Sequence, residues 1–273
     1  MVELLEYGFF RNALVGILLI SVSAAIIGTY IVTRRLVSLS GGVTHACFGG
    51  LGLGYYLGVS PIAMAAVFAV GASMTVEWLS ARRQVREDSA IAAVWALGMA
   101  MGVLFVFMTP GNAPELNSFL FGNILTISTA DLWAFAIYTV VLIAVFAIFY
   151  RPIIICAFDK DFARVTGLPV KTVSYVMTVL VAVCIVLTIR LVGIMMLMSM
   201  LALPQMIAER FAHRFIPMML LSVVISVVTC LAGLLMSAGT DVPCSAIIVI
   251  IQVVTYVVCH LVHTLRPVTH KGQ

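Results

Sequence analysis

Ala13-Leu-Val-Gly-Ile-Leu-Leu-Ile-Ser-Val-Ser-Ala-Ala-Ile-Ile-Gly-Thr-Tyr-Ile-Val32 is a run of 20 residues without a charge, and Thr33-Arg34-Arg35 follows it directly. A helix of about 20 apolar residues is long enough to cross the hydrocarbon core of a bilayer. The run therefore predicts a membrane-spanning helix that ends at a basic cluster.

The same arrangement recurs along the whole chain. Hydrophobic residues make up 63% of the 273 residues and charged residues 10%, against roughly 45–50% and about 25% in soluble domains. This composition predicts an all-α, polytopic transmembrane helix bundle of eight or nine spans, with residues 1–273 in a single domain and no soluble domain. The apolar runs lie at about 13–32, 43–58, 62–79, 90–108, 132–150, 173–189, 192–203, 215–236 and 246–262.

Short basic clusters follow the first, third, fifth, seventh and ninth runs. Lys and Arg are enriched in cytoplasmic loops, so the clusters predict a cell (inner) membrane protein with its N-terminus outside and its C-terminus in the cytoplasm. Membrane orientation also explains the net charge of +4 without a nucleic-acid partner. The clusters are Arg34/Arg35, Arg82/Arg83/Arg86, Arg151/Lys160/Arg164/Lys171, Arg210/Arg214 and Arg266/Lys271.

The second run opens with Ser40-Gly-Gly-Val-Thr-His45-Ala-Cys-Phe-Gly-Gly50. On a helix, Gly41, His45 and Gly49 share a face, so the imidazole projects from a stripe otherwise bare of side chains. An ionisable group inside a span commonly faces a path or cavity, which makes His45 a candidate metal ligand or gate. A neutral imidazole hydrogen-bonded to another helix is the alternative, since one histidine does not make a metal site.

Four other patterns have plainer explanations. Gly50, Gly54 and Gly58 predict close helix–helix packing. His260 and His263 could bind a soft metal, but histidines at a helix C-terminus also interact favourably with its dipole. The Met-rich stretch 195–200 is typical of adaptable packing, and six cysteines without a CxxC predict free, buried thiols.

Three segments between the runs stand out. Residues 109–130, on the predicted outer side, indicate a short helix that lies at the membrane surface or dips back into the fold. Residues 158–171 predict a short amphipathic helix that ends at Gly167. Residues 204–217 predict a surface helix bracketed by prolines, on which a soluble partner could push; a solvated turn is the alternative. The sequence contains no GxxxxGK[ST] motif, so energy from ATP would require another chain.

Six short motifs occur in an order that covers nearly the whole chain. They are Thr44-His-Ala46, Arg86-Glu-Asp-Ser-Ala-Ile91, Phe121-Gly-Asn-Ile-Leu125, Thr166-Gly-Leu-Pro-Val170, Leu191-Val-Gly-Ile194 leading to Leu203-Pro204, and Asp241-Val-Pro243. Their order and spacing resemble those of the permease subunits of ABC importers for zinc, manganese and iron, which are related to the vitamin B12 and siderophore permeases.

The resemblance implies a homodimer around a central path, two cytoplasmic ATP-binding subunits and an external solute-binding protein. It implies no catalytic site and no permanently bound cofactor, only a transported Zn, Mn or Fe ion. Alternating access would be driven through the 204–217 segment. The residues to which it assigns this coupling are Pro204, Met206, Ile207, Glu209, Arg210, Phe211 and Arg214.

One departure from the family pattern concerns the metal site. The family usually carries Asp one turn before the histidine and Pro four residues after it, where this chain has Gly41 and Gly49. His45 therefore carries over as a transient ligand or gate, but the Asp/His pair does not. Two alternatives stay open: a permease of the same fold for a metal chelate or cobalamin-like compound, and a membrane scaffold that transports nothing.

Overall fold

The computed structural model describes residues 7–83, 86–110, 122, 127–240 and 242–265. Within these ranges the chain forms ten helices joined by short turns, and no strand. The helices are α2 (Gly8–Thr33), α3 (Val37–Leu57), α4 (Pro61–Arg83), α5 (Glu87–Met108), α7 (Thr129–Ile148), α8 (Tyr150–Phe158), α9 (Lys160–Val165), α10 (Val170–Glu209), α11 (Phe215–Ser237) and α12 (Cys244–Leu265). The surface helix predicted within 109–130 falls largely outside the described residues.

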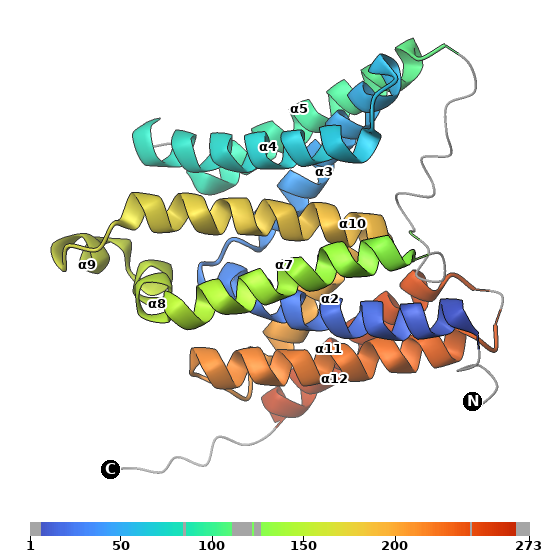
Figure 1. Cartoon of the computed structure of the whole chain (residues 1–273). Helices are drawn as coiled ribbons and strands as arrows, with labels where there is room; N and C mark the ends of the chain where they lie inside the picture. Colours follow the sequence, from blue (N-terminus) through green and yellow to red (C-terminus); the bar gives the residue numbers. More distant parts are fainter. Residues whose placement is uncertain (1–6, 84–85, 111–121, 123–126, 241, 266–273) are drawn as a thin grey trace.

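The eight long helices lie in three groups (Figure 1). The first is the three-helix unit α3, α4 and α5, and the second contains α2, α7, α11 and α12. The long helix α10 lies between them and packs against both. One end of the bundle carries Arg34, Lys160 and Arg214 and is called the basic end; Asp131 and Arg190 mark the far end.

Helix α10 crosses the bundle twice because it bends sharply at Gly193. The backbone angles of Gly193 (φ 78°, ψ 173°) are not helical, and a positive φ favours glycine because it lacks Cβ. Val170 packs beside Cys156 and Ala163, and Glu209 lines the same hollow as Arg34. Both ends of α10 therefore lie at the basic end.

The number of helical segments that run along the bundle agrees with the nine apolar runs of the sequence. Seven helices are long and apolar enough to cross a membrane, and α10 is one of them. Helix α3 is not among the seven, but it runs from the basic end to the far end beside α4 and α5. Because α10 runs along the bundle twice and α3 once more, nine segments of the described chain run between the basic end and the far end.

Glycines let α3 approach its two neighbours at backbone distance. A Cβ on Gly50 would lie 2.5 Å from the carbonyl oxygen of Met64, and one on Gly54 would lie 2.6 Å from Cα of Pro61. The prediction of close packing is thus correct for Gly50 and Gly54. It is wrong for Gly58, which has nothing within 4 Å and instead ends α3 in a left-handed conformation.

The other side of α3 meets α5 in the same way. A Cβ on Gly98 would lie 2.5 Å from Cα of Ala46, and one on Gly49 would lie 2.9 Å from the carbonyl oxygen of Gly98. Small residues allow such close approach, which replaces the hydrophobic driving force that is missing between helices in lipid. The three-helix unit is therefore held by backbone contact on both sides of α3.

We expect Gly50→Ala to lower the free energy of unfolding by about 1–3 kcal/mol, because the new methyl group would overlap the α4 backbone. Gly71→Ala on α4 is the matched control, since a Cβ there meets nothing within 4 Å. Thermal unfolding of the two detergent-solubilised variants measures the difference. Equal stability of the two would contradict backbone contact at Gly50.

Candidate functional site

His45 stacks on an aromatic ring from a neighbouring helix. Its imidazole is half-buried on α3, and the Trp95 indole of α5 lies parallel to it, with centroids 4.6 Å apart and planes inclined by 4°. The carbonyl of His45 also lies close to Gly98. The α3–α5 contact therefore holds the ring in one orientation, and the residue stays partly exposed.

Gly41 and Gly49 do not present one bare stripe beside His45. A Cβ on Gly41 would lie 3.0 Å from Cε of Met198 and 4.0 Å from the Trp95 ring, so this position faces the same surroundings as the imidazole. Gly49 instead faces the α5 backbone at Gly98. The predicted three-residue face is thus wrong at Gly49, because eight residues carry a helix well past two full turns.

The described residues contain no group of three or more His, Cys, Asp or Glu side chains placed to hold a metal. The six cysteines are free, as predicted, and four of them are buried. His260 is exposed and lies near the Tyr256 ring, while the side chain of His263 is outside the described set. Within the part of the chain that the structure describes, His45 therefore lies between α3 and α5 without a second side chain of these types placed to share a metal with it.

The segment 204–217 is not the separate helix that its prolines predict. Pro204 lies within α10, which continues to Glu209, and residues 210–214 form a turn before α11 begins at Phe215. Pro204 and Ile207 are buried, whereas Glu209, Phe211 and Arg214 are exposed and Met206 and Arg210 are half-buried. Exposed coupling candidates therefore gather on the 209–214 turn.

Gln205 explains how α10 continues past a proline. Pro204 has no N–H for the carbonyl of Met200, one turn earlier. The Gln205 amide nitrogen Nε2 donates to that carbonyl oxygen at 3.1 Å and also to the carbonyl oxygen of Ala24 on α2 at 2.9 Å. The side chain thereby replaces the missing backbone donor and ties α10 to α2. Gly28 admits it, since a Cβ there would lie 2.6 Å from Nε2.

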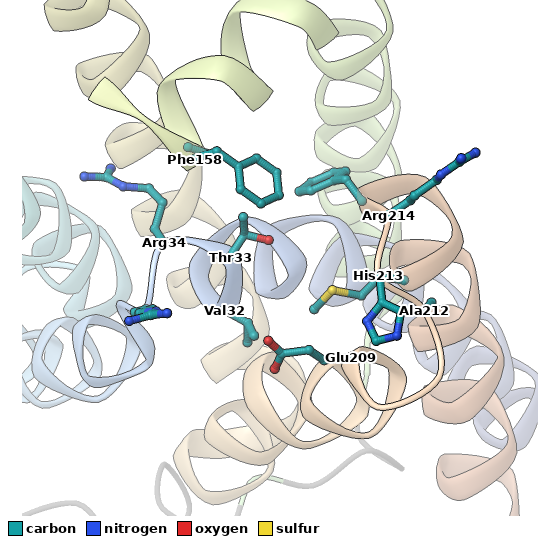
Figure 2. Close-up of a pocket in the computed structure, with 12 residues that line it drawn as sticks. Val32, Thr33, Arg34, Phe158, Glu209, Ala212, His213 and Arg214 are labelled. Atoms are coloured by element: carbon teal, nitrogen blue, oxygen red, sulfur yellow. The ribbon is translucent and has the colours of Figure 1, made fainter. Parts of the chain in front are cut away.

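The 209–214 turn borders a hollow of about 460 Å³ at the basic end (Figure 2). Its lining comes from the end of α2 at Val32 and Thr33, from the end of α8 at Phe158, and from the turn itself. Glu209 and His213 lie on one side of it and Phe158 on the other. A second hollow of about 440 Å³ is lined by Met206, Arg210 and His213 and, from α12, by Tyr256.

Four charged side chains from distant parts of the sequence meet near this hollow. Arg34, after α2, lies 3.9 Å from Glu77 of α4 and 3.6 Å from Glu87 of α5. Lys160 of α9 lies 3.6 Å from Glu77 and 3.3 Å from Glu87. These four residues, the ionic cluster, connect the three-helix unit to the rest of the bundle.

Arg34 is the most buried member of the ionic cluster, with 6% of its side chain exposed. Burial alone would lower the pKa of the guanidinium, but Tyr30, Glu77 and Glu87 outweigh it and the pKa lies above its usual value. Arg34 Nη1 also donates to the Tyr30 hydroxyl at 3.0 Å. The sequence gives no sign that Arg34 meets Glu77 and Glu87, because these carboxylates lie on other helices, far from Arg34 in the chain.

A model of the ABC 3 transport family matches residues 6–263. The chain belongs to this family. A membrane protein of Synechocystis, itself uncharacterized, is 33% identical over 258 residues, which cover 94% of this chain and 92% of that protein. The manganese transport system membrane protein MntC of Halalkalibacterium halodurans is 28% identical over 249 residues, covering 91% and 85%.

Two solved structures share the fold of this ABC 3 family member. PsaBC from Streptococcus pneumoniae, in complex with a Fab, superposes with a TM-score of 0.82 at 23% identity and covers 94% of both chains. An inward-facing metal-chelate type ABC transporter gives a TM-score of 0.74 at 15% identity, covering 92% of this chain and 85% of that one. The predicted fold class and the resemblance to ABC importer permeases are thereby confirmed.

Replacing Gln205 by the similarly sized Leu should lower the free energy of unfolding by about 1–3 kcal/mol, because two buried carbonyls lose a donor. Pro204→Ala restores a backbone N–H for Met200. In that background Gln205→Leu should therefore cost measurably less, as a double-mutant cycle of denaturant unfolding in detergent would report. Equal costs in both backgrounds would refute the replacement of the backbone donor.

Proposed function

We propose that residues 1–273 form the permease domain of an ATP-driven importer for a divalent transition metal: manganese first, with zinc and iron as the alternatives. Membership of the ABC 3 transport family and the name of the MntC relative support this class of cargo. The metal is the transported substrate and no permanently bound cofactor is needed. ATP hydrolysis belongs to a separate subunit.

His45 carries the proposal, as a transient ligand or gate. Its imidazole stacks on Trp95 and stays half-buried, and an ionisable group inside a span is typical of a transport path. A single imidazole binds a divalent ion weakly, which suits a site that must release its cargo. In a homodimer, a second copy would bring a second His45 to the same central path.

The basic end is proposed to face the cytoplasm, since positive residues prefer that side. Two ATP-binding subunits would then dock there and an external solute-binding protein would deliver metal at the far end. Closure of the ATP-binding subunits would push the 209–214 turn. Because this turn joins α10 to α11, its movement would be passed to both helices. Pro204 and Ile207, which are buried in α10, would move with that helix.

His45→Ala should reduce initial Mn²⁺ uptake at least about tenfold, as loss of a metal-site group does. The assay uses proteoliposomes that contain the permease and its ATP-binding subunit, with the solute-binding protein added on the side of the far end. Gly41→Asp is the complementary variant: a Cβ at this position meets the flexible end of Met198 at 3.0 Å, and the added carboxylate should lower the Mn²⁺ concentration at half-saturation. Uptake unaffected by His45→Ala would remove His45 from the path. Uptake of a metal chelate in preference to free Mn²⁺ would point to the alternative cargo.

Phe211→Ser should weaken docking of the ATP-binding subunit several-fold, because it removes an exposed aromatic side chain from the turn. The amount of ATP-binding subunit that co-purifies with the permease measures this. Phe107→Ser, at an exposed position on the far end of α5, is the control and should leave co-purification unchanged. Equal co-purification of the two variants would contradict docking at the turn.

A further inference from the structure

We propose that a groove between α2, α7 and α11 binds one anionic phospholipid, with an acyl chain in the groove and the phosphate between Arg151 and Arg214. The groove belongs to the second group of helices and lies apart from the three-helix unit that carries His45 (Figure 1). The proposal goes beyond the proposed function, because it concerns neither the cargo nor the ATP-binding subunit.

The groove has the size and the lining of a site for a hydrocarbon chain. Its volume is about 600 Å³, within the range of pockets that hold small organic ligands. Val22 and Ile26 of α2 form its floor, and α7 and the start of α11 form its walls. Among the described residues, no charged side chain lines it. The chemistry of the groove therefore fits an acyl chain.

The depth of the groove matches one leaflet of a bilayer. Val22 lies 11 residues before Thr33, the last residue of α2 at the basic end, which is about 16 Å at 1.5 Å per residue. Half of a hydrocarbon core of about 30 Å is about 15 Å. A helix from a partner would need a groove along a whole span of about 20 residues. The depth therefore favours an acyl chain over a spanning helix.

Aromatic rings mark the end of the groove nearest the basic end. Phe146 of α7 stacks with Phe215 of α11 at a centroid distance of 6.3 Å, and Tyr150 of α8 meets Phe215 edge-on at 6.4 Å. All three line the groove. Tyrosine is enriched at the level of the lipid headgroups, so a lipid in this groove would place its headgroup beside Tyr150.

Two unpaired guanidinium groups border the same end. Arg151 follows Tyr150 and Arg214 precedes Phe215, and the Cα atoms of consecutive residues are about 3.8 Å apart. Both arginines are exposed, and neither forms an ion pair with a described residue. In Figure 2, Arg214 points away from Glu209. Because guanidinium groups match the geometry of phosphate, this pair favours an anionic lipid over a zwitterionic one.

The headgroup is tested by native mass spectrometry of the full-length permease, titrated with phosphatidylglycerol or with phosphatidylethanolamine. Phosphatidylglycerol should bind several-fold more tightly, and Arg151→Gln/Arg214→Gln should remove that preference. The control Arg164→Gln/Lys171→Gln removes two exposed charges that do not line the groove and should keep it. Equal binding of the two lipids by the unmodified permease, or equal behaviour of the two double variants, would overturn the proposal.

The acyl chain is tested with Ala147→Trp, which fills the groove from the α7 wall and should weaken phosphatidylglycerol binding several-fold. Ala144→Trp is the matched control, since Ala144 is exposed on the same helix but does not line the groove. Phosphatidylglycerol should also raise the unfolding temperature of the unmodified permease and of Ala144→Trp more than that of Ala147→Trp, because a ligand that binds the native state stabilises it.

Two results of this second experiment would contradict the lipid site. One is phosphatidylglycerol binding by Ala147→Trp equal to that of Ala144→Trp. The other is a change in the oligomeric state of Ala147→Trp while lipid binding stays the same, which would make the groove an interface between copies of the chain.

Discussion

Backbone contact along α3 is the constraint on which the rest of the structure depends. Gly50 and Gly54 bring α4 to this helix, and Gly49 with Gly98 brings α5 to its other side. Side chains could not hold three helices so closely, and in lipid no hydrophobic effect would drive them together. The outcome is a unit stiff enough to keep one imidazole stacked on one indole.

The stiffness of this unit concentrates motion at its borders. Helix α10 separates it from α2, α7, α11 and α12, and the ionic cluster crosses that division at the basic end. Inside the second group, hydroxyl pairs such as Ser23 with Thr139 at 2.8 Å fix α2 against α7. The molecule is therefore built as two bodies with α10 between them, an arrangement suited to rocking transitions.

The sequence predicts the spans well because lipid leaves the backbone little choice: an apolar segment must satisfy its hydrogen bonds internally and becomes a helix. The break at Gly193 is also visible, as an interruption at Arg190. Contacts that depend on how two helices are aligned along their lengths are not visible in the sequence. No pattern in α5 indicates that Trp95 meets His45, Lys160 gives no sign of Glu77 and Glu87, and the predicted helix at Pro204 is wrong because Gln205 supplies the missing donor.

Arg190 lies three residues before the bend of α10 and pairs with Asp131 at 2.7 Å at the far end. The two arms of α10 meet at Gly193 without a connecting loop, so we expect them to insert into the membrane together as a helical hairpin. If the basic end is cytoplasmic, the hairpin tip carries a guanidinium across the membrane, a transfer that costs about 2.5–3.5 kcal/mol at mid-depth. Asp131, at the start of α7, is synthesised before Arg190. Its carboxylate can therefore pair with Arg190 at the far end and hold the hairpin tip there.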